Sequence, residues 1–241
     1  KQGFSINNFK GYIDISGFIT RYTDMMEFMF GFYDIDGSDI STTELQSIVI
    51  NNGIGILSNY LGARSTNIQN ANIPGFEVSI VGQGNITENI SFSTLAGYTY
   101  INPTPTDADS LYLLTFSNPN IENPKNTILK YRNKHMVKID FQIDYKKFAL
   151  GLSSRYSSLM ENVDDVFVSP IAGIEILPGY GSYRNSRMTG DLVFDTRLAY
   201  KINKKSRFSL IVNNLLNREY TNRPGNVLPP RTIVWQYSLK F

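Results

Sequence analysis

The sequence predicts an all-β protein: an antiparallel, up-and-down transmembrane β-barrel segment of roughly nine strands. Three observations predict it. Apolar and polar residues alternate in stretches along the 241 residues, short and long connections between these stretches alternate, and aromatic residues, 13% of the chain, gather near the strand ends. A soluble all-β sandwich would share the alternation but would not require its loop lengths to alternate by side.

The expected strands are read from the alternation of apolar and polar side chains. In one of them, Val137, Ile139 and Phe141 face one side, whereas Lys138 and Asp140 face the other. The last strand ends on an aromatic residue at Phe241. In chain order the alternating stretches are 1–6, 11–33, 76–83, 90–99, 136–145, 148–156, 191–202, 208–213 and 231–241, of which 11–33 is the least regular.

Connections of two lengths separate these strands. Tight turns are expected at 7–10, 87–89, 145–147 and 203–205, and longer loops at 35–58, 101–131, 160–188 and 221–230. Because alternate connections of an up-and-down barrel lie on opposite rims, all tight turns share one rim. Outer-membrane barrels have short periplasmic turns and long extracellular loops, so we expect a periplasmic C-terminus and extracellular long loops.

Composition excludes several classes of protein. The chain has no cysteine, so it holds neither a disulfide nor a cysteine-based metal site. A net charge of +2 is too small to indicate nucleic-acid binding. No apolar run reaches the length of about 18 residues that a membrane helix needs, whereas a barrel strand exposes only alternate residues to lipid.

Catalytic and metal sites have weak candidates. His135 is the only histidine, so we expect no enzyme, no cofactor and no histidine metal site. We expect His135 to be an ordinary residue at the rim. The acidic run from Asp34 to Asp39 hints at Ca²⁺, but Asp39 and Leu45 occupy the places where an EF-hand loop has glycine and glutamate. A solvated loop is the better interpretation.

The C-terminal segment carries a distinctive order of residues. Val212-Asn213-Asn214-Leu215-Leu216-Asn217-Arg218-Glu219-Tyr220 precedes Asn222-Arg223-Pro224-Gly225, then Pro229-Pro230-Arg231-Thr232 and the final strand. This order resembles the C-terminus of TonB-dependent outer-membrane receptors, with a Bacteroidota-like, siderophore-type character. The segments 22–28 and 72–77 also resemble receptor barrel segments. The resemblance is strongest over 189–241 and extends over the whole chain.

The resemblance implies a larger molecule. Barrels of this family have about 22 strands and a plug in the lumen. We therefore expect residues 1–241 to be the C-terminal portion of such a barrel, with the plug domain, the signal peptide and the N-terminal barrel strands absent. The implied partners are that missing barrel and plug, a TonB-type energy-coupling protein, the barrel assembly machinery, the lipid bilayer and a small ligand such as an iron chelate.

Three groups of side chains are the candidate functional residues. Aromatic and cationic side chains on the long loops could bind an anionic chelate by stacking and charge. The ligand candidates on these loops are Tyr112, Phe116, Tyr180, Tyr183, Arg184 and Arg187. On the predicted lumen side, Arg155, Asp191, Asp195 and Arg197 could contact the plug or pair with one another. The resemblance implies an assembly signal at Trp235, Tyr237, Leu239 and Phe241.

The function implied is energy-coupled import of a scarce nutrient through the outer membrane, an iron–siderophore complex being the expected ligand. Two alternatives remain open at this point: a passive porin, and a barrel subunit of an outer-membrane assembly or secretion complex. A plug domain in the full-length protein would distinguish a receptor from a porin, and energy-dependent uptake would distinguish a receptor from an assembly component.

Overall fold

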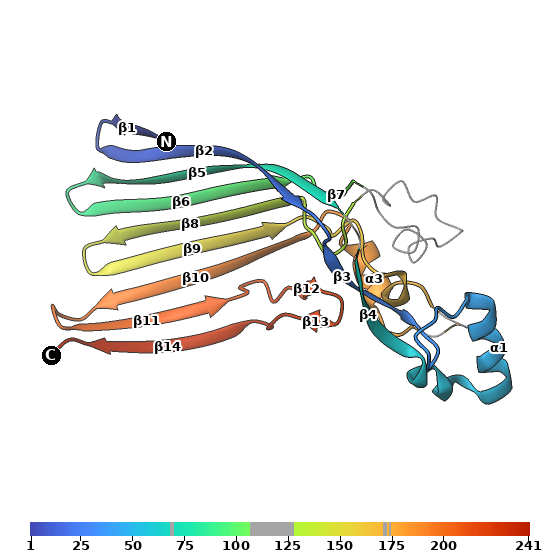
Figure 1. Cartoon of the computed structure of the whole chain (residues 1–241). Helices are drawn as coiled ribbons and strands as arrows, with labels where there is room; N and C mark the ends of the chain where they lie inside the picture. Colours follow the sequence, from blue (N-terminus) through green and yellow to red (C-terminus); the bar gives the residue numbers. More distant parts are fainter. Residues whose placement is uncertain (68–69, 107–127, 171–172, 174) are drawn as a thin grey trace.

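A large antiparallel sheet dominates the structure, a computed structural model that describes residues 1–67, 70–106, 128–170, 173 and 175–241 (Figure 1). Strands follow one another in the order β1-β2-β5-β6-β8-β9-β10-β11-β14. Their bounds are β1 Gln2–Ile6, β2 Phe9–Tyr22, β5 Ala71–Thr87, β6 Ile90–Ile101, β8 His135–Tyr145, β9 Phe148–Ser157, β10 Asp191–Lys201, β11 Ser206–Asn213 and β14 Thr232–Leu239. The prediction of an up-and-down antiparallel barrel segment is confirmed.

The two ends of the sheet differ as the loop lengths predict. All tight turns lie at the end that also holds the C-terminus, and all long connections lie at the opposite end (Figure 1). We call these ends the tight-turn rim and the loop rim. The loop rim contains β3 (Met26–Phe32), α1 (Thr42–Asn52), a 3-10 helix (Ile54–Asn59), β4 (Leu61–Asn67), β7 (Thr104–Pro105), a second 3-10 helix (Asp165–Phe167), α3 (Tyr180–Ser186), β12 (Thr221–Arg223) and β13 (Asn226–Val227).

Two local expectations are corrected by the structure. The single strand expected over 11–33 is divided into β2 and β3, because the chain bends around Asp24, whose φ is +52°, and β3 pairs with β4 in a separate sheet. The expected loop 35–58 contains α1, which begins with a capping box between Ser41 and Glu44. Among the described residues, no helix is long and apolar enough to span a membrane.

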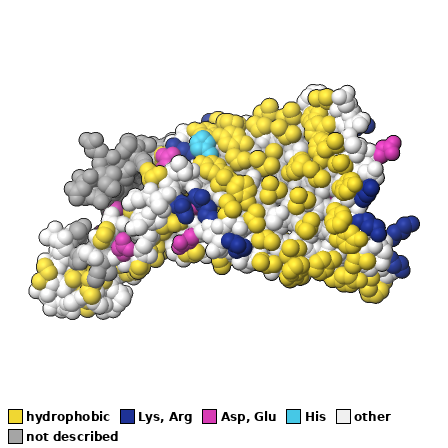
Figure 2. All heavy atoms as spheres, turned by 180° about the vertical axis from the view of Figure 1, so that it is seen from behind, with side chains coloured by type: hydrophobic (Ala, Val, Ile, Leu, Met, Phe, Trp, Pro, Cys, Tyr) yellow, Lys and Arg dark blue, Asp and Glu magenta, His cyan; other side chains and the backbone are white. Residues whose placement is uncertain are grey.

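The registers place apolar side chains of neighbouring strands on a common face. Leu150, Leu198, Leu210 and Trp235 stand opposite one another across β9, β10, β11 and β14. Trp235 and Leu150 remain 64% and 52% exposed, as expected of side chains whose solvent is lipid. Figure 2 shows hydrophobic side chains spread over this side of the sheet.

Aromatic rings form rows on this apolar face near both rims. At the tight-turn rim, three ring pairs join neighbouring strands, namely Phe4–Phe9, Phe148–Tyr200 and Phe208–Trp235, and Phe9–Phe92 joins β2 to β6 across Gly84 of β5, with centroids 4.8–5.5 Å apart. At the loop rim, Phe76, Tyr98, Tyr100 and His135 pack together. Two such rows are typical of the interfacial girdles of membrane barrels.

The buried core lies at the loop rim rather than within the sheet. One cluster joins Phe32, Leu45, Leu57 and Val166, from β3, α1 and the two 3-10 helices. A second cluster consists of Met29, Ala71, Ile73 and Leu129. Apolar side chains that contact one another therefore hold the described parts of the long connections as packed structure.

Candidate functional site

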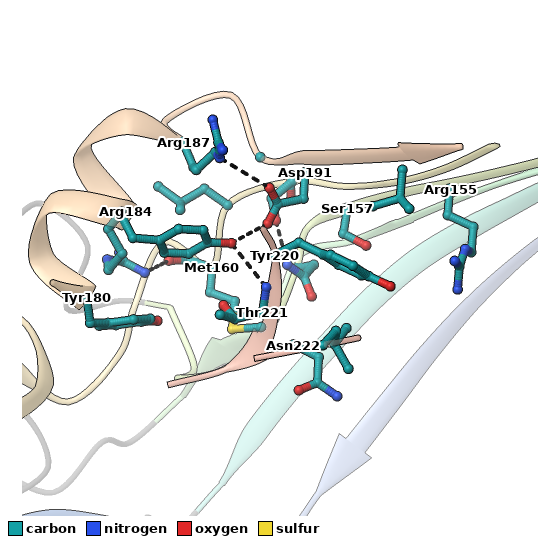
Figure 3. A pocket seen from close by; sticks show the side chains of 17 residues that line it. Arg155, Ser157, Met160, Tyr180, Arg184, Arg187, Asp191, Tyr220, Thr221 and Asn222 are labelled. Atoms are coloured by element: carbon teal, nitrogen blue, oxygen red, sulfur yellow. Dashed lines mark hydrogen bonds and ion pairs between the residues drawn. The ribbon is translucent and has the colours of Figure 1, made fainter. Parts of the chain in front are cut away.

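A cavity of about 190 Å³ lies at the loop rim, where the β9–β10 connection meets the β11–β14 connection (Figure 3). Four of the predicted ligand residues line it, namely Tyr180, Tyr183, Arg184 and Arg187, together with Arg155 and Asp191 from the predicted lumen-facing group. Tyr220, from the C-terminal segment that carries the family resemblance, also lines it. We call this cavity the loop-rim pocket.

The local backbone explains why these side chains converge. Helix α3 begins after Gly179, whose φ of +80° lies in the left-handed region, and it presents Tyr180, Tyr183 and Arg184. The chain then enters β10 through Gly190, whose φ is +86°. A Cβ on Gly190 would stand 2.3 Å from the carbonyl oxygen of Ser157, so only glycine brings β10 this close to the end of β9.

Asp191 links the two connections that form the pocket (Figure 3). Its carboxylate accepts hydrogen bonds from the Tyr183 hydroxyl at 2.5 Å and from Arg218 Nε at 3.1 Å. Arg187 Nε lies 3.8 Å from the same carboxylate. The Tyr183 hydroxyl in turn accepts a hydrogen bond from the backbone N–H of Thr221 at 3.1 Å. These contacts hold α3 against β12, and they orient the pocket wall.

The pocket presents hydrogen-bond donors. Arg184 Nη1 donates to the carbonyl oxygen of Met160 at 2.9 Å. Arg187 Nε is buried and makes no hydrogen bond in the described part of the chain. Burial raises the pKa of the Tyr180 and Tyr183 phenols, and the hydrogen bond to Asp191 raises that of Tyr183 further. Both phenols therefore stay protonated at neutral pH, so the wall is suited to an anionic or acceptor-rich ligand.

A second cavity of about 480 Å³ lies on the other side of β12, since Asn222 lines the loop-rim pocket and Arg223 lines this one. Aromatic rings of Phe28, Phe30 and Phe167 and the guanidinium groups of Arg132 and Arg223 line it. Phe28, Phe30, Arg132 and Arg223 were not predicted as cavity residues. For Phe28 and Phe30 the reason is that β3 was taken as part of a continuous barrel strand.

A buried ion pair also escaped the sequence analysis. Lys130 and Asp164, both with fully buried side chains, pair beneath the loops. Asp164 further accepts hydrogen bonds from the Tyr131 hydroxyl and from the backbone N–H of Phe30. Burial lowers the pKa of Lys130, against the attraction of Asp164, and raises that of Tyr131. Asp164 therefore joins three segments of the loop rim.

The predicted lumen-facing residues form ion pairs along the polar face of the sheet. Arg155 Nη2 lies 3.0 Å from Asp195, and Arg197 Nη2 lies 3.0 Å from Asp140 on β8. Asp191 instead lies at the loop rim, where it pairs with Arg218 and Tyr183. Arg155 and Arg197 keep side-chain exposures of 48% and 42%, so their outer edges remain open toward the polar side.

The remaining candidates have simpler positions. Tyr112 and Phe116 lie outside the residues that the structure describes. In the acidic run, Ser38 donates to Asp36 and Arg64 pairs with Asp39 at 3.2 Å, and no group of three metal-binding side chains occurs in the described ranges. His135 Nδ1 lies 2.8 Å from the Tyr98 hydroxyl. The side chains of the predicted assembly signal, Trp235, Tyr237, Leu239 and Phe241, are all exposed.

Comparison with known proteins gives the same architecture. The family model described as TonB dependent receptor-like, beta-barrel, matches residues 3–215. No curated protein matches the chain. Among solved structures, the chain is similar to the ferric-catecholate import receptor Fiu of Escherichia coli K12, with a TM-score of 0.56, 18% identity and coverage of 97% of this chain and 25% of Fiu.

Two further solved structures are similar over almost the whole chain. The copper transporter OprC has a TM-score of 0.57 and 14% identity, over 99% of this chain and 30% of OprC. The ferripyoverdine receptor of Pseudomonas aeruginosa has a TM-score of 0.53 and 13% identity, over 97% of this chain and 25% of the receptor. At these identities the likeness shows the fold alone, and the chain spans about a quarter to a third of these receptors' lengths.

Proposed function

The chain belongs to the TonB-dependent receptor family, and from this premise we propose that it forms the C-terminal wall of a receptor that imports an iron–siderophore complex. Members of this family are transporters of the bacterial outer membrane rather than enzymes. In this proposal the loop rim is extracellular, the tight-turn rim is periplasmic, and a TonB-type protein supplies energy through parts of the receptor outside these 241 residues.

One observation carries the proposal: the loop-rim pocket gathers two arginines and three tyrosines from two separate connections. Arg187 Nε is buried and makes no hydrogen bond among the described residues, and it lies 3.8 Å from Asp191. The guanidinium group that carries it is matched to the oxygen atoms of an anionic chelate. At about 190 Å³ the cavity is smaller than the range of roughly 300–1,000 Å³ for complete ligand pockets. It therefore holds one edge of the ligand, and the rest of the site comes from the remaining barrel and the plug.

Two further roles complete the proposal. The exposed edges of Arg155 and Arg197 contact the plug, since their guanidinium groups stay accessible beside their carboxylate partners. The side chains of Trp235, Tyr237, Leu239 and Phe241, on one face of the last strand, form the signal that the barrel assembly machinery reads. The plug contact uses charged side chains of the polar face, and the assembly signal uses aromatic and apolar side chains of the apolar face.

The pocket assignment is tested by Arg184→Ala/Arg187→Ala in the intact receptor. Affinity for the ferric siderophore is expected to fall roughly tenfold or more, because the variant removes both cationic donors from the pocket that holds this edge of the ligand. Siderophore binding to cells and energy-dependent uptake of labelled iron are the measurements. Arg207→Ala, which removes an exposed arginine at the tight-turn rim, is the control and should bind normally.

Unchanged affinity in the double variant, with normal receptor levels in the outer membrane, would contradict the assignment of the pocket. Uptake that persists without the cellular energy source would favour a passive porin. Binding of a protein without any uptake of a small ligand would favour an assembly or secretion component.

A further inference from the structure

Lysines are concentrated on two neighbouring turns of the tight-turn rim. Lys146 and Lys147 form the β8–β9 turn, and Lys204 and Lys205 lie in the β10–β11 turn. All four are exposed. We call them the basic rim. Figure 2 shows Lys and Arg side chains gathered at the end of the molecule opposite the loops.

The two turns and the end of β14 form one continuous surface. The backbone N–H of Lys201 donates to the carbonyl oxygen of Lys147 at 2.8 Å, and Lys147 Nζ donates to the carbonyl oxygen of Ile202 at 3.4 Å. The backbone N–H of Lys240 donates to the carbonyl oxygen of Lys205 at 2.8 Å. The positive charges are therefore held side by side rather than spread around the barrel.

None of the four lysines forms an ion pair within the described ranges. The ion pairs of that part of the chain involve other cations, at the loop rim or along the polar face. Two carboxylates lie near the turns. Glu88 occupies the β5–β6 turn, and Asp144 accepts a hydrogen bond from Gln142 Nε2 at 2.9 Å. The basic rim thus keeps its charge available for an external anion.

The aromatic row of the same rim determines which anion this surface fits. Phe148, which directly follows Lys147, packs on Tyr200 at 4.8 Å, and Phe208 packs on Trp235 at 5.5 Å, all on the lipid-facing side. Aromatic side chains of this kind sit at the level of the lipid headgroups. Lys146 and Lys147, next to Phe148, and Lys204 and Lys205, three or four residues before Phe208, then reach the phosphates.

We propose that the basic rim binds the phosphate headgroups of anionic phospholipids in the adjacent leaflet. The proposal goes beyond import, and it rests on family membership and on the assignment of the lipid-facing side rather than on the ligand. An acidic soluble protein is the other partner that positive charge would suit. The membrane is favoured because the lysines continue an aromatic row that faces lipid, which a soluble partner would not require.

The test measures binding of phosphatidylglycerol to the intact receptor in detergent, by native mass spectrometry over a lipid titration. The variant is Lys146→Gln/Lys147→Gln/Lys204→Gln/Lys205→Gln. Each lysine near an anionic surface contributes about fivefold in affinity, so the quadruple variant should lose roughly tenfold if only two lysines reach the phosphates and about 600-fold if all four do. Binding in detergent does not depend on orientation in the cell or on transport, so its outcome is separate from that of the uptake experiment.

Two variants and one lipid serve as controls. The four Lys→Arg substitutions keep the charge and should keep the affinity. Arg21→Gln/Arg231→Gln removes exposed positive charge elsewhere and should leave phosphatidylglycerol binding unchanged. Phosphatidylethanolamine should bind weakly and equally to every variant. Unchanged phosphatidylglycerol affinity in the Lys→Gln variant, or an equal loss for phosphatidylethanolamine, would overturn the proposal. Lysine-dependent binding of an acidic soluble protein, without lysine-dependent binding of phosphatidylglycerol, would overturn it too.

Discussion

At the scale of single residues, Asn214 and Asn217 of the motif that carries the family resemblance hold the β11–β14 connection through hydrogen bonds. Asn214 is 2% exposed, its side chain both donates to and accepts from the backbone of Arg218, and its own N–H donates to Asp195 at 2.8 Å. Asn217 accepts from the N–H of Arg231 at 2.9 Å. Both asparagines have φ near +50°, a conformation that asparagine tolerates better than most residues.

The sequence singled out four residues that the structure brings together at one cavity, but it gave no signal for the buried ion pair. Tyr180, Tyr183, Arg184 and Arg187 could be singled out together because aromatic and cationic residues cluster on one long connection. Asp164 gave no signal, since an acidic residue in a loop is usually solvated and its partner lies on another connection. Only the packing of the loops brings the two charges together.

The buried pair leads to a prediction for Asp164→Asn. Removing this carboxylate leaves the Lys130 ammonium buried without its countercharge, which should destabilise the loop rim by about 3–5 kcal/mol. Limited proteolysis of the loops in the intact receptor measures the effect as faster cleavage. Asp165→Asn is the matched control. Burial raises the pKa of Asp165, so losing its charge should be neutral or slightly stabilising. Equal cleavage rates in wild type and Asp164→Asn would contradict the role of the pair.

At the scale of the elements, period-two alternation was enough to find the nine strands of the main path and to group the side chains of each face, although it missed the short β7. It was not enough at the loop rim. Ser41 and Glu44 have the spacing of a capping box, which is a signal for a helix start. Helix α1 was nevertheless not predicted, because the segment was assigned to a loop by its position between strands. The division between β2 and β3 was missed because apolar residues continue through the bend.

The lipid-facing assignment leads to a prediction for Ile139→Arg. Ile139 lies in the middle of β8, opposite Ala96 and Ser154, and is 41% exposed on the apolar face. An arginine near the bilayer midplane should destabilise the barrel by about 2–4 kcal/mol, measured by urea unfolding of the receptor in lipid. Gln142→Arg, on the polar face of the same strand, should change stability far less. A neutral Ile139→Arg would refute the assignment of faces.

At the scale of the whole molecule, the sheet is an open wall. Its nine-strand path begins at β1 and ends at β14. We propose that the remaining wall, the plug and the coupling region belong to other parts of the receptor. The alternation of loop lengths predicted the separation of rims, because it follows from the order of strands alone. The contents of the loop rim depend on contacts between distant connections, and a single sequence does not encode these contacts as a periodic pattern.

The central claim is that the loop rim, with its pocket, faces the outside of the cell and the tight-turn rim faces the periplasm. The chain contains no cysteine, so single cysteines report on position without background from these residues. Ile35→Cys at the loop rim and Glu88→Cys at the tight-turn rim place one thiol on each side. With a membrane-impermeant maleimide on intact cells, the account predicts labelling of the first and protection of the second until the outer membrane is opened. Labelling of the cysteine at position 88 alone would contradict it.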